Sequence, residues 1–356
     1  MSMQLTIKFR LRDKHAAELN RQARAVNFVW NYCNDAQKHA FQTQWAWRDK
    51  WLSAAAMMRL TAGAGEELDL HAHTVQGVCK QYAKSRRQQK KRWLRYRGRK
   101  SLGWVPYNTG HVFFDGEAFR FRGARYTTMH LRDFLKPGIK IGAGSFNQDA
   151  RGRWYINVPI EVECADRAPN TRVGIDLALK ALATLSDERE IAIPQFYRKN
   201  EAKLATVQRA RKAPKRLRTI HAKIANRRKD FLHKRSAEIV KEYGLIVVGD
   251  VSPSKLAKTR MAKSVRDAGW ADLKRTLSYK AITHGGMCLE VKEAWSSQVC
   301  SECGCLPSSR PKGIADLGIR GWSCSDCGAI HPRDVNAAKN ILRVGLDMLV
   351  EGARHV

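Results

Sequence analysis

The chain contains 356 residues, of which 44% are hydrophobic and ten are tryptophan, so it has enough apolar material for two or three folded domains and is not a disordered basic tail. Lysine and arginine number 65 against 33 acidic residues, and the net charge of +32 would repel itself in a compact state unless a polyanion neutralised it. No segment approaches the roughly 18 apolar residues of a membrane span, and the N-terminus lacks the apolar core of a signal peptide. We therefore expect a cytoplasmic, nucleoid-associated protein that binds nucleic acid and no membrane. Non-specific binding and a ribosomal role stay open at this point.

The first half of the chain combines strand and helix patterns. Residues 3–11 alternate apolar and polar side chains, which is typical of a half-buried strand. Residues 13–97 are helical in texture, and we expect this region to end in a strongly basic helix from Lys84 to Lys100. Short strand patterns follow at 112–114, 119–121 and 154–162. The N-terminal strand should join these later strands around an inserted helical bundle, before a linker at 165–171.

The second half follows a different order. Three short strands come first, at 173–177, 181–186 and 190–193. A basic helical stretch at 198–243, interrupted by Pro214, precedes a buried strand at 245–250. More helix continues to residue 283, and a fifth strand follows at 287–291. A cysteine cluster and a final helix, residues 334–350, complete the order of a ribonuclease-H-like nuclease core.

Five of the nine cysteines lie within 28 positions, and four of them form two Cys-x-x-Cys pairs separated by twenty residues. The paired residues are Cys300, Cys303, Cys324 and Cys327. Four thiolates close a tetrahedral shell around Zn²⁺ without an open position, so this spacing predicts one structural zinc ion. Cys305 and His331 are the competing ligands, and we rank both behind the paired cysteines.

Two acidic residues stand at positions that suit metal-dependent chemistry. Asp176 ends the strand Val-Gly-Ile-Asp, and Asp334 lies at the start of the last helix. By itself, the first is typical of a turn and the second of a helix N-cap. Together, a carboxylate on the first strand and one on the last helix suit two-metal phosphodiester hydrolysis, in which shared carboxylates hold two Mg²⁺ ions about 4 Å apart.

These motifs resemble those of the TnpB family, the transposon-encoded RNA-guided DNA endonucleases related to type V CRISPR effectors. The resemblance rests on Gly174-Ile-Asp-Leu, the paired Cys-x-x-Cys, and the stretch Arg333-Asp-Val-Asn-Ala-Ala-Lys-Asn-Ile-Leu. The segments Arg228-Lys-Asp-Phe-Leu-His-Lys and Ser296-Ser-Gln-Val-Cys are also similar to the family. The specific motifs fall in the C-terminal half, and the first 165 residues share only the architecture.

The resemblance implies a multidomain α+β fold. Its parts are a β-barrel-like wedge domain (1–12 and 104–168), a helical recognition domain (13–103), a RuvC-like nuclease domain (169–296 and 331–356) and a zinc-ribbon insertion (297–330). It also implies a guide RNA derived from the transposon end and a double-stranded DNA target next to a short adjacent motif. The expected reaction is cleavage of that DNA with Mg²⁺, for which Mn²⁺ is a substitute.

The sequence departs from the family where a Glu usually ends the fourth strand, because Gly249 stands there. Asp250 is a poor replacement, since alternation points it to the opposite face of the strand. Glu293 is the better candidate, because it follows the next strand and neighbouring strands lie about 4.8 Å apart. Gly249 would leave room for its carboxylate, as in the relocated Glu of the Fanzor relatives. Glu290 is the next candidate, although its parity puts it on the other face.

Asp176, Glu293 and Asp334 are therefore the expected Mg²⁺ ligands of an RNA-guided DNA endonuclease. The first alternative, suggested by Gly249, is a nuclease-inactive RNA-guided DNA-binding protein that acts as a repressor. The second is a zinc-ribbon protein that packages RNA.

Two basic segments suit phosphate contacts in either RNA-guided case. Residues 84–100 contain ten lysines and arginines, and residues 201–234 contain twelve against two acidic residues.

Overall fold

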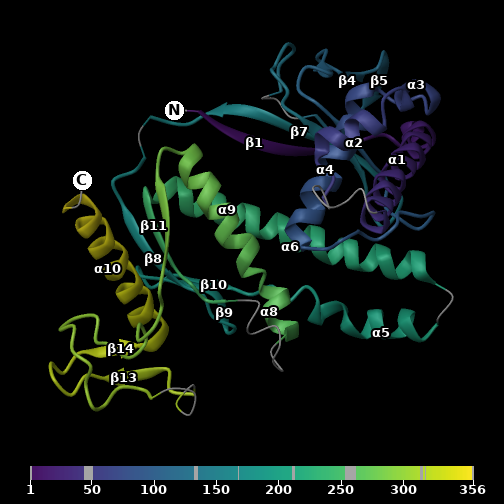
Figure 1. The fold of residues 1–356 in the computed structure, drawn as a ribbon. Coiled ribbons are helices and arrows are strands. Elements are labelled where there is room, and N and C mark those ends of the chain that lie inside the picture. The colour runs from purple at the N-terminus through teal and green to yellow at the C-terminus, as the bar shows by residue number, and fades with distance from the viewer. Residues whose placement is uncertain are drawn as a thin grey trace. The chain divides into compact units, whose positions relative to one another are not determined.

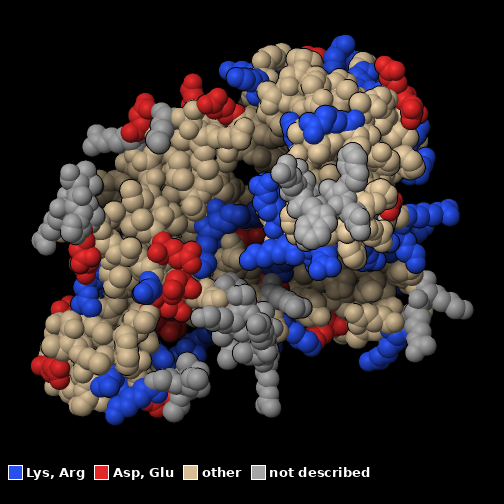
Figure 2. Space-filling model, in the orientation of Figure 1, with Lys and Arg blue, Asp and Glu red and all other residues tan. Residues whose placement is uncertain are grey.

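The computed structural model describes residues 2–43, 51–131, 135–166, 168–210, 213–252, 262–312, 316 and 318–354. The chain divides into two compact units, residues 2–162 and residues 163–356. Each unit has its own hydrophobic core. Figure 1 shows the helices and strands that make up each unit. Lys and Arg side chains are spread over both units on the face that Figure 2 shows. No helix in the described part of the chain is both long and apolar enough to cross a bilayer.

The strands of the N-terminal unit form two sheets. The larger sheet has the order β1-β7-β6-β2, with strands Ser2–Arg10, Trp154–Glu163, Gly144–Gln148 and Trp104–Tyr107. The smaller antiparallel sheet contains β3, β4 and β5, which are Val112–Phe114, Ala118–Phe121 and Ala124–Thr127. The N-terminal strand therefore pairs with the strand expected at 154–162, as the alternating patterns predicted.

Helices connect β1 to β2 in the same unit. They are the 3-10 turn η1 (Asp13–His15), α1 (Ala16–Gln42), α2 (Ala54–Leu60), α3 (Ala64–Glu67) and α4 (Ala72–Gln89). Apolar side chains of α1 and α4 recur on one face of each helix and meet in the core, where the rings of Trp30 and Tyr82 lie 5.1 Å apart.

The basic helix expected from Lys84 to Lys100 is wrong beyond Gln89. Lys90 has a left-handed backbone, which ends α4, and residues 91–103 form neither helix nor strand. The side-chain amides of Asn31 and Asn34 on α1 each make two hydrogen bonds with this segment, Asn31 with the backbone of Arg97 and Asn34 with that of Leu94. These contacts satisfy the backbone in place of helical hydrogen bonds, and charge density alone gave no sign of them.

A five-stranded mixed sheet forms the centre of the C-terminal unit. Its order is β10-β9-β8-β11-β12, with strands Glu190–Ala192, Ala181–Leu185, Arg172–Asp176, Leu245–Gly249 and Met287–Val291. The last three are parallel, and β9 is antiparallel to both of its neighbours. All five strands lie where the sequence predicted them.

The helices of this unit follow the predicted order. They are η3 (Arg198–Asn200), α5 (Glu201–Arg209), α6 (Pro214–Glu242), α8 (Ala262–Ala268), α9 (Trp270–Thr283) and α10 (Arg333–Arg354). Pro214 occupies the first position of α6, where its missing N–H costs nothing. Between α9 and α10 lie the cysteines and a two-stranded ribbon, β13 (Gly321–Ser323) and β14 (Ile330–Pro332). The whole is a multidomain α+β fold with mixed sheets.

Candidate active site and cysteine cluster

Asp176 and Asp334 are brought together by the packing of α10 against β8. A Cβ atom at Gly174 would lie only 2.0 Å from the carbonyl oxygen of Ala338, so the glycine lets the helix approach the strand closely. Asp176 is the last residue of β8, and Asp334 lies in the first turn of α10. The end of the strand and the start of the helix therefore present two carboxylates to the same region.

Glu293 lies two residues beyond the end of β12, which pairs in parallel with β11 so that Val291 is opposite Gly249. A Cβ atom built on Gly249 would lie 2.7 Å from Glu293 Oε2 and 3.2 Å from Glu293 Cβ. Real Cβ atoms do not approach a neighbour as closely as the first of these distances. The carboxylate of Glu293 thus fills the space that a side chain at position 249 would otherwise occupy.

The three carboxyl groups interact electrostatically. Burial, followed by the negative charges of Asp334 and Glu293, raises the pKa of Asp176 to about 7, while the nearby Arg333 opposes the shift. Burial and the charge of Asp250 also raise the pKa of Glu293, against the effect of Lys274. A divalent cation would relieve the repulsion among partly buried carboxylates. Mg²⁺ prefers oxygen ligands, so the donor chemistry of the three residues suits such an ion. Among the described residues, the paired cysteines are the one group whose ligand atoms already lie within 4.8 Å of one another.

The other two acidic candidates, Glu290 and Asp250, have different partners. Glu290 forms an ion pair with Lys274 of α9, with 2.5 Å between Oε1 and Nζ. Asp250 is exposed, and its Oδ1 accepts a hydrogen bond of 3.2 Å from the backbone N–H of Glu293. Asp250 therefore supports the backbone of Glu293 instead of replacing its side chain.

Two arginines near the acidic residues were not identified from the sequence. Arg320 Nη1 lies 3.5 Å from Asp334 Oδ2, and the buried Arg333 donates a hydrogen bond of 2.6 Å to the carbonyl oxygen of Asp316. Both lie beside the cysteine ribbon, in a chain already rich in arginine. Arg333 is distinguished by its place directly before Asp334 in the sequence, and Arg320 by its position near Asp334 in space.

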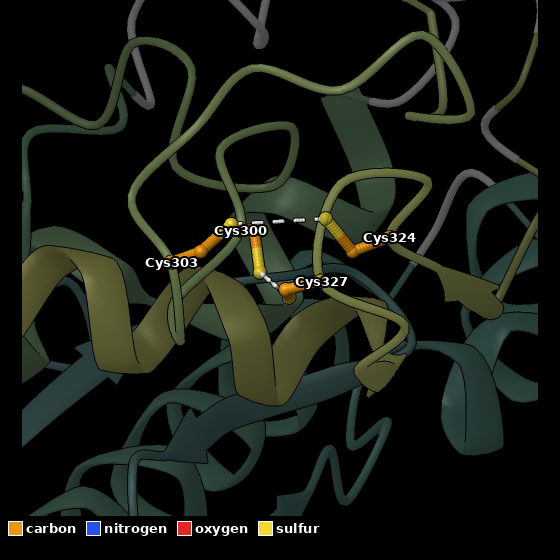
Figure 3. A group of neighbouring side chains, drawn as sticks. All are labelled: Cys300, Cys303, Cys324 and Cys327. Carbon is orange, nitrogen blue, oxygen red and sulfur yellow. Dashed lines mark hydrogen bonds between the residues drawn. The ribbon is translucent and has the colours of Figure 1, made fainter.

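The four paired cysteines form one cluster, in which every sulfur lies within 4.8 Å of the others (Figure 3). Cys300 Sγ is 3.6 Å from Cys327 Sγ, and Cys303 Sγ is 3.8 Å from Cys324 Sγ. Tetrahedral Zn–S bonds of about 2.3 Å place the sulfurs about 3.8 Å apart, so the cluster fits a zinc ion.

The two competing ligands lie outside this group of four. Cys305 is exposed, and its thiol points to the carbonyl oxygen of Cys303 at 3.9 Å. His331 is buried with its Nε2 3.0 Å from Cys300 Sγ, and its ring packs 4.9 Å from that of Trp322. His331 therefore contacts one sulfur as a hydrogen-bonding partner.

Comparisons with known proteins match the chain over most of its length. Residues 155–260 match a family model described as "Probable transposase", and residues 270–341 match one described as "Cas12f1-like, TNB domain". A Streptomyces pristinaespiralis protein described as an RNA-guided DNA endonuclease is 31% identical over 361 residues, which cover 94% of this chain and 87% of the relative. The RNA-guided DNA endonuclease InsQ of Escherichia coli K12 is 26% identical, with 97% and 93% covered.

A solved chain from a cryo-EM structure of the Cas12f1-sgRNA-target DNA complex aligns with 96% of this chain and 99% of its own length, at 15% identity and a TM-score of 0.39. Mimivirus proteins described as TnpB-like are 29% identical over 146 residues. From the sequence relatives, and above all from the 31% identity over nearly the whole chain, the protein belongs to the TnpB family of RNA-guided DNA endonucleases.

Proposed function

We propose that the chain is an RNA-guided, divalent-metal-dependent DNA endonuclease in which Asp176, Glu293 and Asp334 are the catalytic carboxylates. The observation that supports this most directly is the carboxylate of Glu293 in the space facing Gly249. The raised pKa of Asp176, which depends on the charges of both other acidic residues, adds to it. The family membership supplies the reaction, and the sheet and α10 are the RuvC-like nuclease domain of this proposal.

The three carboxylates would hold the divalent cation. Bound Mg²⁺ or Mn²⁺ supplies Lewis-acid stabilisation of the attacking and leaving oxygens of a phosphodiester. Asp176 stays protonated more readily than an ordinary aspartate, because burial and two neighbouring charges oppose its ionisation. Arg333 favours the ionised form, so this buried guanidinium helps Asp176 to act as a ligand near neutral pH.

The proposed partners are a guide RNA from the transposon end and a double-stranded DNA target. Base pairing with the guide would select the target DNA sequence. The lysine and arginine side chains, which give the chain its net charge of +32, would contact the phosphate backbones. The cysteine cluster would bind one structural Zn²⁺ that stabilises the ribbon. The relocated position of Glu293 supports the Fanzor-like lineage, and an enzyme with these partners would act at the cytoplasmic nucleoid.

The test is co-expression of the protein with RNA from the flanking transposon end, followed by cleavage of a plasmid library that carries the matched target. We expect cleavage with Mg²⁺ next to a short motif, and loss of cleavage with retained target binding in Glu293→Gln. Undiminished cleavage by Glu293→Gln would remove this residue from the site. Failure of the unchanged complex to cut at any Mg²⁺ or Mn²⁺ concentration would instead support the nuclease-inactive alternative. That alternative is not favoured, because a carboxylate fills the space at Gly249.

A further inference from the structure

Two asparagines of α10 hold the loop that follows β12. The side-chain amide of Asn340 donates hydrogen bonds to the carbonyl oxygens of Ser296 and Val299 at 2.8 and 2.7 Å. The side-chain amide of Asn336 donates to the same two oxygens at 3.1 and 2.8 Å. Two NH₂ groups and two carbonyls thus form a closed square of four hydrogen bonds, which we call the asparagine clamp. The asparagines are four residues apart, the spacing that places side chains on one face of a helix.

The clamp is buried, which makes it rigid. The exposed fraction is 0% for Asn336 and 3% for Asn340. A buried carbonyl that loses its donor suffers the full desolvation penalty, so the loop cannot leave these amides without replacing them. The motif Asp-Val-Asn-Ala-Ala-Lys-Asn contains both residues, and the proposed reaction assigns a task only to its aspartate.

The clamped loop begins at Glu293. The backbone N–H of Ser296 donates to the carbonyl oxygen of Glu293 at 3.1 Å, and that of Val299 donates to Trp295 at 3.0 Å. Trp295 has a φ of +68°, a conformation that its neighbours must enforce. Ser296, whose carbonyl oxygen accepts hydrogen bonds from both asparagines, is therefore joined by a direct hydrogen bond to the backbone of Glu293.

The same helix also contains Asp334, two residues before Asn336. One rigid element therefore places one acidic residue directly and the other through the clamp. We propose that Asn336 and Asn340 are positioning residues that fix the Glu293 carboxylate relative to Asp334 and so set the affinity of the site for its divalent cation. This inference rests on the proposed function, because it takes Glu293 as a metal ligand.

Asn340 is the better residue for a test. The Oδ1 atom of Asn336 also accepts a hydrogen bond of 2.9 Å from the backbone N–H of Ser301, which lies between Cys300 and Cys303. A change at position 336 would therefore disturb the cysteine cluster as well. Asn340 Oδ1 makes no hydrogen bond within the described residues, so Asn340→Ala removes only the two hydrogen bonds that its amide nitrogen donates to the loop.

The first measurement is the Mg²⁺ dependence of cleavage by the protein purified with its guide RNA. We expect Asn340→Ala to raise the Mg²⁺ concentration for half-maximal rate by roughly 10–100-fold, the usual effect of losing a partner that orients a metal ligand. Target binding and zinc content should stay unchanged. The second measurement is hydrogen–deuterium exchange of residues 293–299, whose amides should exchange faster in the variant. This readout does not depend on cleavage activity.

Leu342→Ala is the matched control. Leu342 of α10 packs against the apolar cluster of Val247, Val291 and Ile341 and does not line the small cavity beside the clamped loop, so its truncation lowers stability while the clamp remains intact. We expect this control to keep the unchanged Mg²⁺ dependence and the slow exchange of residues 293–299. If both variants shift the two readouts equally, the asparagine is merely structural and the inference is overturned.

Glu293→Gln separates this inference from the proposed function. If Glu293→Gln abolishes cleavage while Asn340→Ala retains the unchanged Mg²⁺ dependence, the clamp is overturned and the proposed site stands. If Glu293→Gln cleaves normally, the glutamate and the clamp that serves it are both overturned. If Asn340→Ala prevents folding, Asn340→Gln provides the second variant, because a displaced amide should still shift the Mg²⁺ dependence.

Discussion

At Gly249 the absence of a side chain determines where a neighbouring carboxylate can lie. Glu293 Oε2 and Ile341 Cδ1 would be 2.7 Å and 3.3 Å from a Cβ atom at that position. The first neighbour is the end of a flexible side chain, so it can move at little cost in stability. The position of the carboxylate, in contrast, would change.

Gly249→Ala should therefore separate activity from stability. We expect cleavage to fall at least about tenfold, because Glu293 must swing away from the site, which is an effect typical of a displaced metal-ligand shell. The free energy of unfolding should change by less than about 1 kcal/mol, since alanine fits an ordinary strand backbone. Cleavage kinetics and thermal denaturation check the two expectations. An unimpaired Gly249→Ala enzyme would show that this space is not used.

His71 illustrates how a single residue fixes the start of α4. Its Nδ1 accepts a hydrogen bond of 3.2 Å from the backbone N–H of His73, so it acts as the N-cap. The rings of His73 and His111 lie 5.2 and 4.5 Å away. Burial, then the charges of His111, His73 and Arg122, lowers the pKa of His71 below its ordinary value of 6.5.

The lowered pKa predicts acid sensitivity of the N-terminal unit. Folding favours neutral His71, so its contribution is fully present above pH 6.5 and is lost as the pH falls below that value towards the folded-state pKa. The melting temperature should fall over this interval, and less steeply in His71→Asn, whose amide caps the helix without titrating. His15, whose pKa burial also lowers, accounts for a remaining slope. Identical pH profiles for the two proteins would contradict the role of His71.

At the scale of elements, the cysteine ribbon is too small to fold by apolar burial alone. Strands β13 and β14 have three residues each, and within the described residues the apolar cluster around them consists of Cys300, Trp322 and Cys324, with Ala329 packed against it. Metal binding is therefore expected to supply the stability of this element. Because β14 leads directly into α10, the ribbon also influences where that helix begins.

Cys324→Ser should remove the zinc and loosen the ribbon. We expect elemental analysis to give one zinc per chain for the unchanged protein and much less for the variant. Hydrogen exchange should increase within residues 300–330. Cys305→Ser is the control, because Cys305 lies outside the cluster and its replacement should leave the zinc content unchanged. Equal zinc loss in both variants would mean that the ligand set is different.

Single helices and strands could be predicted from the sequence where local patterns of side chains determine them. Alternation located β1 and β7, short apolar runs located the five strands of the C-terminal sheet, and Pro214 located the start of α6, while β2, β5 and β6 were not predicted. The basic helix through Lys100 was wrong, because the backbone of residues 94 and 97 binds the side chains of Asn34 and Asn31, which lie 60 and 66 positions away. A local pattern contains no information about such distant partners.

At the scale of the whole molecule, the net charge of +32 favours binding to nucleic acid. Only 33 acidic residues offset it, and ion pairs such as Arg189 with Glu242 engage some of them within the chain. Binding to RNA or DNA would release counterions from the phosphates and relieve the repulsion among the basic side chains.

Affinity for RNA should therefore fall steeply with salt. If the protein contacts six to ten phosphates, the association constant should decrease by roughly 10³-fold or more between 50 and 200 mM salt. Filter binding over a salt series measures this slope. Stability without RNA should respond in the opposite direction, because salt screens the self-repulsion. A flat binding curve would contradict an interface built on phosphate contacts.

The sequence alone determined the local and compositional features: the strands of the C-terminal sheet and part of those of the N-terminal unit, the paired cysteines and the affinity for polyanions. It also singled out Asp176 and Asp334 from their places at the end of a strand and the start of a helix, and Glu293 as the replacement for the Glu that the family resemblance implies at Gly249. The tertiary structure places the Glu293 carboxylate in the space expected at Gly249, and it alone shows that Asn336 and Asn340 hold the loop of Glu293. These contacts join residues about forty positions apart or more, and their geometry depends on the register of parallel strands and the packing of α10, which no local pattern encodes.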